Sequence, residues 1–324
     1  MGEDSGLDTA GLLRLAVSAL GGDDRPGQVA MAEAVADALT NGRHALIQAG
    51  TGTGKSLAYL VPAGASAIRE DTRIVVSTAT LALQRQVVHH DLPLVLDALA
   101  LALGDRPRVA LLKGRANYLC RFRLSGGYPE PDDVLDVGYT PVSRLGKELA
   151  RLTSWAEETE TGDRDDLEPG VSPLAWGRVS VDGRECLGSA CPLASECFGE
   201  SAATRARAAQ IIVTNHAMLA IQACSHDVLG PMDALIVDEA HELVSRITSG
   251  ATKELTARRI EVTARAVRRC GVEATRLDEA VGTFERVLDD LRVGRLGIGL
   301  PEALAGALSE VRGEIREALR GVAE

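Results

Sequence analysis

Residues 44–56 read HALIQAGTGTGKS, and this stretch decides the fold class of the chain. Glycines and threonines alternate after a short apolar run, and the loop then leads Lys55 and Ser56 into a helical pattern. Glycine permits backbone conformations in which successive N–H groups point at one anion, and a helix N-terminus adds a positive dipole. The pattern predicts a phosphate-binding loop, with Ala49 in place of the usual first glycine.

Each residue of this loop has a predicted role. We expect the Lys55 ammonium to reach the β- and γ-phosphates of a nucleotide and the Ser56 hydroxyl to ligate Mg²⁺. Leu46 and Ile47 are predicted to end the preceding strand. A flexible turn before a helix is the simpler alternative, and it involves no ligand. The other nucleotide-binding residues predicted in the loop are Gly50, Thr51, Gly52, Thr53 and Gly54.

The composition is that of a globular protein of about two domains: 324 residues, 45% hydrophobic and 25% charged. No uninterrupted apolar run approaches the ~20 residues that span a bilayer. The first residues, MGEDSGLDTAG, lack the basic start and apolar core of a signal peptide, so we expect a cytoplasmic protein. The net charge of −11 argues against nucleic-acid binding through overall charge, although a local basic groove remains compatible with it.

Apolar runs rich in β-branched residues recur between helical patterns. They predict an α/β fold with a buried parallel sheet. The runs begin at Arg73, Arg108, Gln210 and Ala234.

Polar residues follow two of these predicted strands. Thr78 and Thr80 lie at a strand's carboxyl end, where open α/β sheets place ligand contacts, although helix capping explains them equally well. The run from Ala234 ends in Asp238 and Glu239. An acid at this position can hold Mg²⁺ opposite the loop hydroxyl, and its neighbour can accept a proton from water.

Residues 113–123, KGRANYLCRFR, combine basic and aromatic side chains in a chain with few aromatics. This mixture suits contact with a nucleic-acid backbone and bases. A solvated basic face is about equally well supported. The basic residues are Lys113, Arg115, Arg121 and Arg123.

Cysteines in a large chain without a secretion signal indicate metal ligands or buried thiols rather than disulfides. Cys186, Cys191 and Cys197 form a C-x₄-C-x₅-C run, and Cys120 supplies a fourth thiolate. Four thiolates are the number that a [4Fe–4S] cluster requires. A zinc site and unligated thiols stay open as alternatives.

Composition changes in the middle and at the end of the chain. Residues 126–170 are rich in Pro, Gly and acids, and we expect a partly exposed insertion in which residues 157–170 are mobile. The pattern is helical from Ser249 onward. Cys224 and Cys270 stand apart from the other cysteines and are predicted to be buried free thiols.

Taken together, the motifs resemble the iron–sulfur superfamily 2 DNA helicases, the XPD/DinG-like group. They cover residues 25 to 241 in the family's order, which is much more specific than any single motif. The motifs are RPGQ at 25–28, AGTGTGKS at 49–56, STATLALQRQ at 77–86, KGRANYLC at 113–120, VTNHAML at 213–219 and VDEAH at 237–241.

The resemblance implies a domain organisation. Residues 1–112 would form the first part of a RecA-like motor domain with the P-loop, and residues 113–204 an iron–sulfur cluster insertion. The motor domain would continue through residues 205–248 with the DEAH box. Residues 249–324 would begin a helical arch domain.

The resemblance also implies residue roles. Arg25 and Gln28 would bind the nucleotide, Gln28 through the adenine edge. Glu239 would be the catalytic base beside the Mg²⁺ ligand Asp238, and His241 would couple hydrolysis to DNA contact. The four clustered cysteines match the family's [4Fe–4S] ligands.

The implied function is an ATP-dependent DNA helicase of 5′ to 3′ polarity, acting in DNA repair or replication. Its cofactors would be ATP, Mg²⁺ and a [4Fe–4S] cluster. Its partners would be single-stranded DNA and duplex junctions, and the sequence leaves open whether RNA–DNA hybrids also serve. The protein would act as a monomer in the cytoplasm, on the nucleoid in a bacterium.

The family's second RecA-like domain, with its arginine finger, has no counterpart before Glu324. An arginine finger contributes about 10³ to 10⁵ in rate, so we expect an N-terminal portion that binds ATP far better than it hydrolyses it. No N-terminal exonuclease module is expected. The alternatives are a non-catalytic regulatory fragment that binds ATP and nucleic acid, and a zinc-stapled or redox-sensing P-loop protein.

Overall fold

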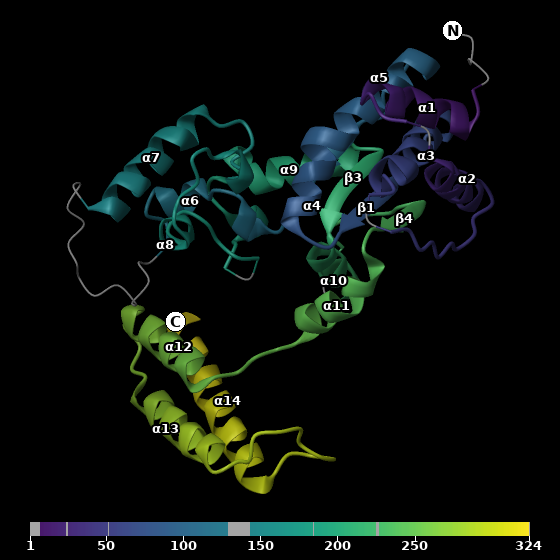
Figure 1. Cartoon of the computed structure of the whole chain (residues 1–324). Coiled ribbons are helices and arrows are strands. Elements are labelled where there is room, and N and C mark those ends of the chain that lie inside the picture. The colour runs from purple at the N-terminus through teal and green to yellow at the C-terminus, as the bar shows by residue number, and fades with distance from the viewer. Residues whose placement is uncertain are drawn as a thin grey trace. The chain divides into compact units, whose positions relative to one another are not determined.

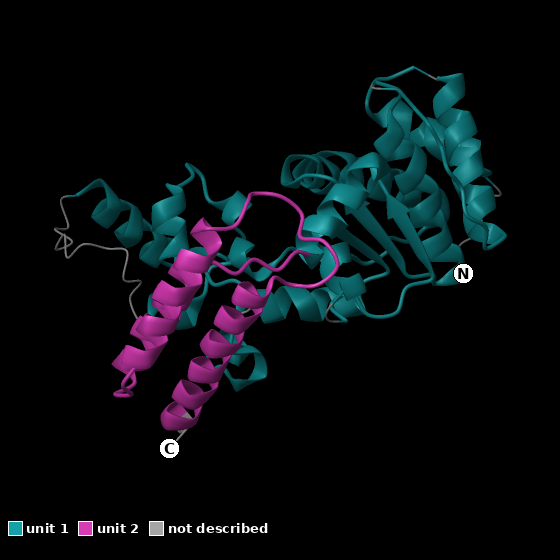
Figure 2. Cartoon of the chain, turned by 90° about the horizontal axis from the view of Figure 1, so that it is seen from below, with its two compact units in different colours: residues 1–130, 136–251 teal, residues 131–135, 252–324 magenta. Residues whose placement is uncertain are grey.

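The computed structural model describes residues 7–23, 25–50, 52–128, 143–183, 185–224 and 227–323. The chain forms two compact units (Figure 2). Unit 1 comprises Met1–Glu130 and Asp136–Ala251, and unit 2 comprises Pro131–Leu135 and Thr252–Glu324.

Unit 1 is built on a parallel sheet of four strands in the order β2-β3-β1-β4 (Figure 1). The predicted parallel α/β fold is confirmed, and all four strands lie in the predicted apolar runs. The strands are β1 Ile74–Thr78, β2 Val109–Leu111, β3 Ile211–Asn215 and β4 Ala234–Val237.

Alternate residues of the strands face two different hydrophobic cores. Ile74 and Val76 of β1 belong to a core formed with helices α1, α3 and α5, while Val75 between them belongs to a second core. This alternation follows from the pleat of a strand, which points successive side chains to opposite faces. The helices on the first side are α1 Thr9–Ala19, α2 Pro26–Thr40, α3 Lys55–Glu70 and α5 Leu92–Leu103.

The stretch Leu81–Leu103 is helical throughout, from α4 (Leu81–Gln86) through the π-helical turn η1 (Val87–Asp91) into α5. This helical stretch of 23 residues is long enough and apolar enough to cross a membrane, judged by length and composition alone. Its apolar side chains Val87, Leu92 and Val95 are buried in the first core. This packing is typical of a core helix in a globular fold.

The second core lies on the other face of the sheet, and most of its buried residues come from residues 110–229. Leu119, Leu152 and Trp176 pack there with Ile212 of β3. The elements on this side are α6 Arg121–Leu124, α7 Arg144–Glu158, α8 Pro173–Gly177, α9 Phe198–Ala208 and α10 His216–Cys224. Short 3₁₀ turns connect them: η2 Arg115–Asn117, η3 Arg164–Asp166, η4 Gly188–Ala190 and η5 Ala194–Glu196.

Three expectations differ from the structure. Residues 157–170 were predicted to be mobile, but Asp163 and Leu167 are buried. Leu167 packs in the second core, and Asp163 forms an ion pair with Lys113. Residues 44–50 before the P-loop form no strand, and Leu46 is 97% exposed, because this short run pairs with none of the described strands. Cys224 and Cys270 are exposed rather than buried.

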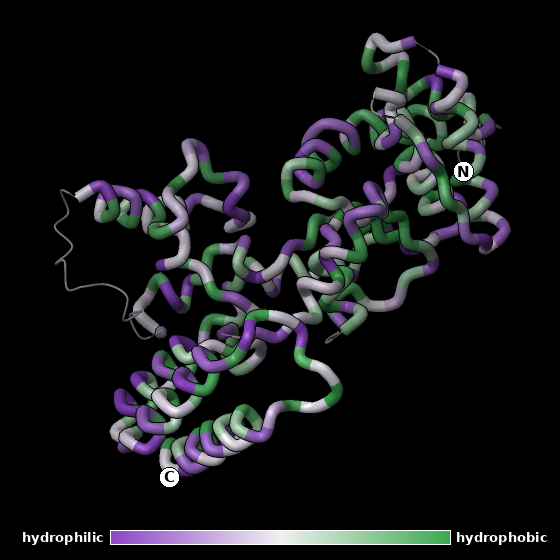
Figure 3. The backbone as a smooth tube through the Cα atoms, turned by 60° about the horizontal axis from the view of Figure 1, so that its bottom comes forward, coloured by the Kyte–Doolittle hydropathy of each residue, from purple (hydrophilic) through white to green (hydrophobic). Residues whose placement is uncertain are grey.

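Unit 2 has a hydrophobic core of its own. Ile260, Leu277, Phe284 and Leu304 are buried between three helices, and polar residues alternate with apolar ones along the same helices (Figure 3). These helices are α12 Ala257–Arg269, α13 Thr275–Asp289 and α14 Glu302–Ala323. The segment before them in unit 1 is the turn η6 Ala240–Glu242 followed by α11 Leu243–Ala251.

Candidate nucleotide-binding site

The predicted phosphate-binding loop enters α3 through left-handed glycines. Gly52 has a φ of 81° and Gly54, the residue that caps α3, has a φ of 78°. A Cβ atom at Gly54 would lie 2.2 Å from the side-chain nitrogen of Gln28. Only glycine fits this position, on grounds of both backbone conformation and space. Thr51 lies outside the described residues.

The two predicted nucleotide contacts ahead of the loop hold the loop by its backbone. Gln28 is 4% exposed, and its Nε2 donates to the Gly54 carbonyl at 2.9 Å. Arg25 donates to the Gly52 carbonyl. Within the loop, Thr53 Oγ1 donates to the Gly50 carbonyl at 2.9 Å. The loop is therefore fixed by side chains from the start of α2 and by its own threonine.

The Lys55 ammonium forms an ion pair with the Glu239 carboxylate, which is 184 residues away in the sequence. Both side chains are partly exposed, at 24% and 29%. The hydrogen bond from Lys55 lowers the pKa of Glu239 below its ordinary value. His241 Nδ1 lies 3.5 Å from the other oxygen of Glu239, and its side chain is exposed. The P-loop and the DEAH box thus meet at one place.

Asp238 lies deeper than Glu239, at the end of β4. Its N–H donates to the Ser77 carbonyl at 2.9 Å, and Tyr59 Oη donates to its Oδ2 at 3.3 Å. Burial raises the pKa of Asp238, while the nearby Lys55 lowers it. The Tyr59 hydroxyl also interacts with the side chain of Ser56, which is half-buried. Tyr59 therefore connects the two predicted Mg²⁺ ligands.

Tyr59 was missed by the sequence reasoning. It is 2% exposed on α3, and burial raises its pKa, so its phenol is neutral. The available signal was its position three residues after Ser56, which puts both side chains on the same face of α3.

Glu239 has a left-handed backbone, with a φ of 53°, between β4 and η6. This conformation is uncommon for a residue with a Cβ atom and costs roughly 1–3 kcal/mol. The surrounding contacts that hold it are those of Asp238 with Ser77 and of Glu239 with Lys55. The turn that carries the predicted acids is therefore strained.

The threonines after β1 take the capping arrangement. Thr80 is exposed, and its hydroxyl accepts from the Leu83 N–H at 3.2 Å at the start of α4. Thr78 is fully buried, and its hydroxyl lies 3.2 Å from the Thr80 carbonyl. Only Thr80 is open to a ligand in this conformation.

Sequence reasoning also missed a buried polar pair beside the DEAH box. Ser77 Oγ lies 2.7 Å from His216 Nδ1, and both residues have 0% exposure. Burial lowers the pKa of His216, so its ring is neutral at pH 7. The sequence signal for this pair was the position of His216 directly after β3, at the same edge of the sheet as Thr78 and Asp238.

Lys113 does not reach the surface, which corrects its predicted contact with nucleic acid. Its ammonium is 2.6 Å from an Asp163 oxygen and 2.8 Å from an Asp165 oxygen. Lys113 is 3% exposed. A buried cation requires a partner, and the acids supplied it from the segment that was expected to be mobile.

The three predicted basic contacts in the same segment also have protein partners. Arg115 forms an ion pair with Glu200, and the guanidinium of Arg121 lies 4.8 Å from the ring centre of Phe198. Arg123 Nη1 donates to the Ser180 carbonyl at 2.8 Å. The structure therefore does not gather these cations on a free basic surface. Their interactions hold the segment to its neighbours.

The four clustered cysteines are half-buried. Burial raises the pKa of the Cys120 thiol, and Cys197 and Cys191 lie near enough to Cys120 to raise it further. The pKa of the Tyr128 phenol is raised by burial and by the nearby Cys120, Cys186 and Cys191. Arg115 Nη1 donates to Cys197 Sγ at 3.7 Å. In the described ranges no three Cys, His, Asp or Glu side chains are already placed around one metal position.

The donor set of these cysteines is compatible with an iron–sulfur cluster. Backbone N–H groups already point at two of the sulfurs: Arg123 N lies 3.4 Å from Cys120 Sγ, and Gly188 N lies 3.5 Å from Cys186 Sγ. Hydrogen bonds to sulfur are among the features by which proteins support such clusters.

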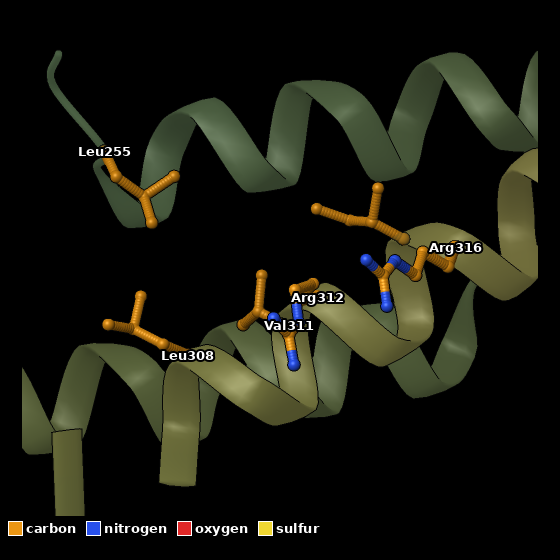
Figure 4. Close-up of a pocket in the computed structure, with 6 residues that line it drawn as sticks. Leu255, Leu308, Val311, Arg312 and Arg316 are labelled. Carbon is orange, nitrogen blue, oxygen red and sulfur yellow. The ribbon is translucent and has the colours of Figure 1, made fainter. Parts of the chain in front are cut away.

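Unit 2 contains a pocket of about 360 Å³ between the start of α12 and α14 (Figure 4). Its apolar wall includes Leu255 and Leu308, and Arg312 and Arg316 extend from α14 beside it. The pocket contains no carboxylate, thiol or histidine side chain. It has no chemistry comparable to that of the P-loop.

Comparison with known proteins gives matches to helicases. The DEAD/DEAH box helicase family model matches residues 29–97. The ATP-dependent helicase DinG of Mycobacterium tuberculosis (strain ATCC 25618 / H37Rv) is 48% identical over 308 residues, covering 91% of this chain and 46% of that protein. The ATP-dependent DNA helicase YoaA of Escherichia coli (strain K12) is 36% identical over 236 residues, covering 71% of this chain and 35% of that protein.

A solved structure named XPD_Helicase aligns with 93% of this chain and 48% of its own, at 14% identity and a TM-score of 0.45. The chain spans at most about half the length of the curated relatives it matches.

Proposed function

The chain is homologous to DinG-type ATP-dependent helicases along 91% of its length, and on this premise we propose that it is the nucleotide-binding part of a DNA helicase motor. In that motor the chain binds ATP with Mg²⁺, and hydrolysis drives movement along single-stranded DNA with 5′ to 3′ polarity. Duplex junctions and RNA–DNA hybrids are its further substrates. It acts as a monomer in the cytoplasm.

The observation that carries this proposal is the meeting of Lys55 with Glu239. Two motifs that are far apart in the sequence bring a lysine, a serine and two acids together at the carboxyl edge of a parallel sheet. Open α/β folds bind ligands at this edge. A chance pairing of a Gly-rich turn with an acidic turn would not be expected to produce this combination.

The geometry supports a sequence of events at Lys55. Phosphate oxygens of an incoming nucleotide replace the Glu239 carboxylate as the partner of the ammonium. Glu239 then loses the hydrogen bond that lowers its pKa, so the carboxylate becomes a stronger base. It can accept a proton from a water molecule that attacks the γ-phosphate. The ion pair with Lys55 therefore keeps Glu239 a weak base until a nucleotide binds.

Ser56 and Asp238 are the residues that would hold Mg²⁺, with Tyr59 orienting both. When bound, the ion neutralises charge that develops on the phosphates. Arg25 and Gln28 support the loop. We place the adenine on the solvent side of Gln28, beside the start of α2. His241 lies beside Glu239 and links the site to DNA contact.

Cys120, Cys186, Cys191 and Cys197 would hold a [4Fe–4S] cluster. These thiolates would be its ligands, and the bound cluster would link the segment before α6 to the region of the turns η4 and η5. DNA contact in this proposal belongs to Thr80 and to the exposed parts of Arg115, Arg121 and Arg123. Lys113 has no part in it.

The test compares two variants of the site. Lys55→Ala should weaken MgATP binding about 10- to 100-fold, because charged hydrogen bonds contribute ~1.5–3 kcal/mol and 1.4 kcal/mol is tenfold in affinity. Glu239→Gln should retain MgATP binding and reduce hydrolysis by about 10²–10⁴. Equilibrium titration with a fluorescent ATP analogue and steady-state ATPase assays measure the two effects.

Single-stranded DNA distinguishes a motor from a non-catalytic fragment. Hydrolysis that DNA stimulates supports the motor, whereas tight MgATP binding without any turnover supports the regulatory alternative. Unchanged MgATP affinity in Lys55→Ala would contradict the assignment of the loop.

A further inference from the structure

Ser77, the fourth residue of β1, makes two contacts that link different elements. Its carbonyl accepts the Asp238 N–H at 2.9 Å, and its hydroxyl lies 2.7 Å from His216 Nδ1. One residue after it comes Thr78, and the exposed cap Thr80 follows. Ser77 therefore lies between the acidic turn of the nucleotide site and the sheet edge proposed to face DNA.

Among the described residues, the second ring nitrogen of His216, Nε2, is buried and has no partner within hydrogen-bonding geometry. The backbone of Glu239 and Asp238 is nevertheless near enough to the ring to oppose the lowering of its pKa by burial. A buried polar atom without a partner costs about 1–3 kcal/mol. If His216 only filled space, an apolar ring would do so without the cost of a buried, unpartnered nitrogen.

The backbone that acts on the pKa of the His216 ring includes that of Glu239, which is strained. Glu239 has the left-handed conformation, and its side chain is tied to Lys55. Release of that ion pair removes one of the contacts that hold the strain. A peptide group of the turn is then free to reorient toward Nε2 of His216, which donates or accepts a hydrogen bond according to the tautomer of the ring.

We propose that His216 is a positioning residue that couples the nucleotide state of the acidic turn to the DNA-facing end of β1. Its Nε2 forms a hydrogen bond with the turn at Asp238–Glu239 when the peptide group there reorients. Its Nδ1, bonded to the Ser77 hydroxyl, shifts Ser77 in response. The inference rests on the proposed function, because it assumes that MgATP binds at Lys55 and DNA at the edge that contains Thr80. It adds a connection between the two sites.

The experiment measures coupling in the full chain. The affinity for an oligothymidine strand is determined by fluorescence anisotropy with and without saturating MgATPγS, and the ratio of the two dissociation constants is the coupling factor. For the unmodified chain we expect a ratio that differs from one by about fivefold or more. MgATPγS affinity without DNA is measured separately.

Three variants divide the connection. His216→Asn keeps a polar atom near the Nδ1 position and removes Nε2, whereas His216→Gln reaches toward the Nε2 position and removes the contact to Ser77. Ser77→Ala removes the partner hydroxyl. Each should bring the coupling factor close to one while MgATPγS affinity without DNA stays the same. Cys224→Ser, an exposed change on the same helix α10, is the control and should keep full coupling.

The outcomes separate this inference from the function on which it rests. An unmodified chain that binds both ligands without coupling overturns the inference alone, as does full coupling in both His216→Asn and Ser77→Ala. A chain that fails to bind MgATPγS overturns the proposed function as well. Circular dichroism checks that each variant is folded, and Ser77→Ala provides the test if the histidine variants unfold.

Discussion

At the scale of single residues, the predicted Mg²⁺ site depends on a phenol. Tyr59 is buried on α3, and its hydroxyl interacts with both Ser56 and Asp238. The carboxylate of Asp238 is costly to bury, as its raised pKa indicates. The hydrogen bond from Tyr59 lowers that cost and fixes the rotamer of the acid.

Tyr59→Phe should therefore raise the Mg²⁺ concentration needed for half-maximal MgATP binding by about three- to tenfold, which corresponds to a hydrogen bond of ~0.5–1.5 kcal/mol. Titration of Mg²⁺ at fixed nucleotide measures this change. Tyr128→Phe, which removes a hydroxyl bonded to the Glu185 carbonyl, is the matched control. An unchanged Mg²⁺ dependence in Tyr59→Phe would show that the phenol does not position the acid.

Lys55, Ser56, Asp238 and Glu239 could be predicted because each follows a local pattern: a glycine loop before a helix, or acids after an apolar strand. Tyr59 could not be distinguished from an ordinary core aromatic. Its function depends on a contact with a residue 179 positions away, which no local pattern encodes.

At the scale of elements, the basic segment before α6 is held in the fold by a buried ion pair. The Lys113 ammonium and the Asp163 carboxylate are both almost completely buried. Burial raises the pKa of Asp163 even though Lys113 opposes that shift. The cost of desolvation thus exceeds the attraction, so the pair fixes which segment packs there rather than adding much stability.

Lys113→Ala should lower the free energy of unfolding by about 3–5 kcal/mol, because it leaves a buried carboxylate without its cation. The double variant Lys113→Met with Asp163→Leu should recover most of that loss. Denaturant unfolding followed by circular dichroism measures both. Lys147→Ala, an exposed lysine on α7, should change stability by no more than ~0.5 kcal/mol. A mild effect of Lys113→Ala alone would mean that water reaches Asp163.

This pair also explains why residues 157–170 were mispredicted. Acid-rich composition usually indicates an exposed segment. Here the acids are ordered by a lysine that lies 50 residues earlier. The four described strands and most helices, by contrast, were predictable from apolar patterns, because each buries apolar side chains in one of the hydrophobic cores.

At the scale of the whole molecule, the described residues form three hydrophobic cores in two compact units. Two cores lie on opposite faces of the sheet in unit 1, and the third belongs to the helices of unit 2. The four clustered cysteines lie in unit 1, in the part that packs on the second core. Loss of a cluster there should leave the first core and its nucleotide site intact.

Cys120→Ser should therefore lose iron and sulfide in anaerobically purified protein while MgATP binding changes little. Iron and sulfide analysis, with the absorbance of the cluster, measures the first effect, and titration with a fluorescent ATP analogue measures the second. Cys270→Ser, an exposed cysteine in unit 2, is the control. Stoichiometric zinc, or full iron content in Cys120→Ser, would contradict the assigned ligands.

The position of β4 affects how this protein behaves in solution. Among the described strands β4 is the last of the sheet and pairs only with β1, and Leu235 within it is 45% exposed. An unprotected strand edge can add a strand from another molecule, which begins aggregation. Only four residues long, β4 offers a short template for such growth. Colloidal stability at high protein concentration therefore depends on what covers this edge.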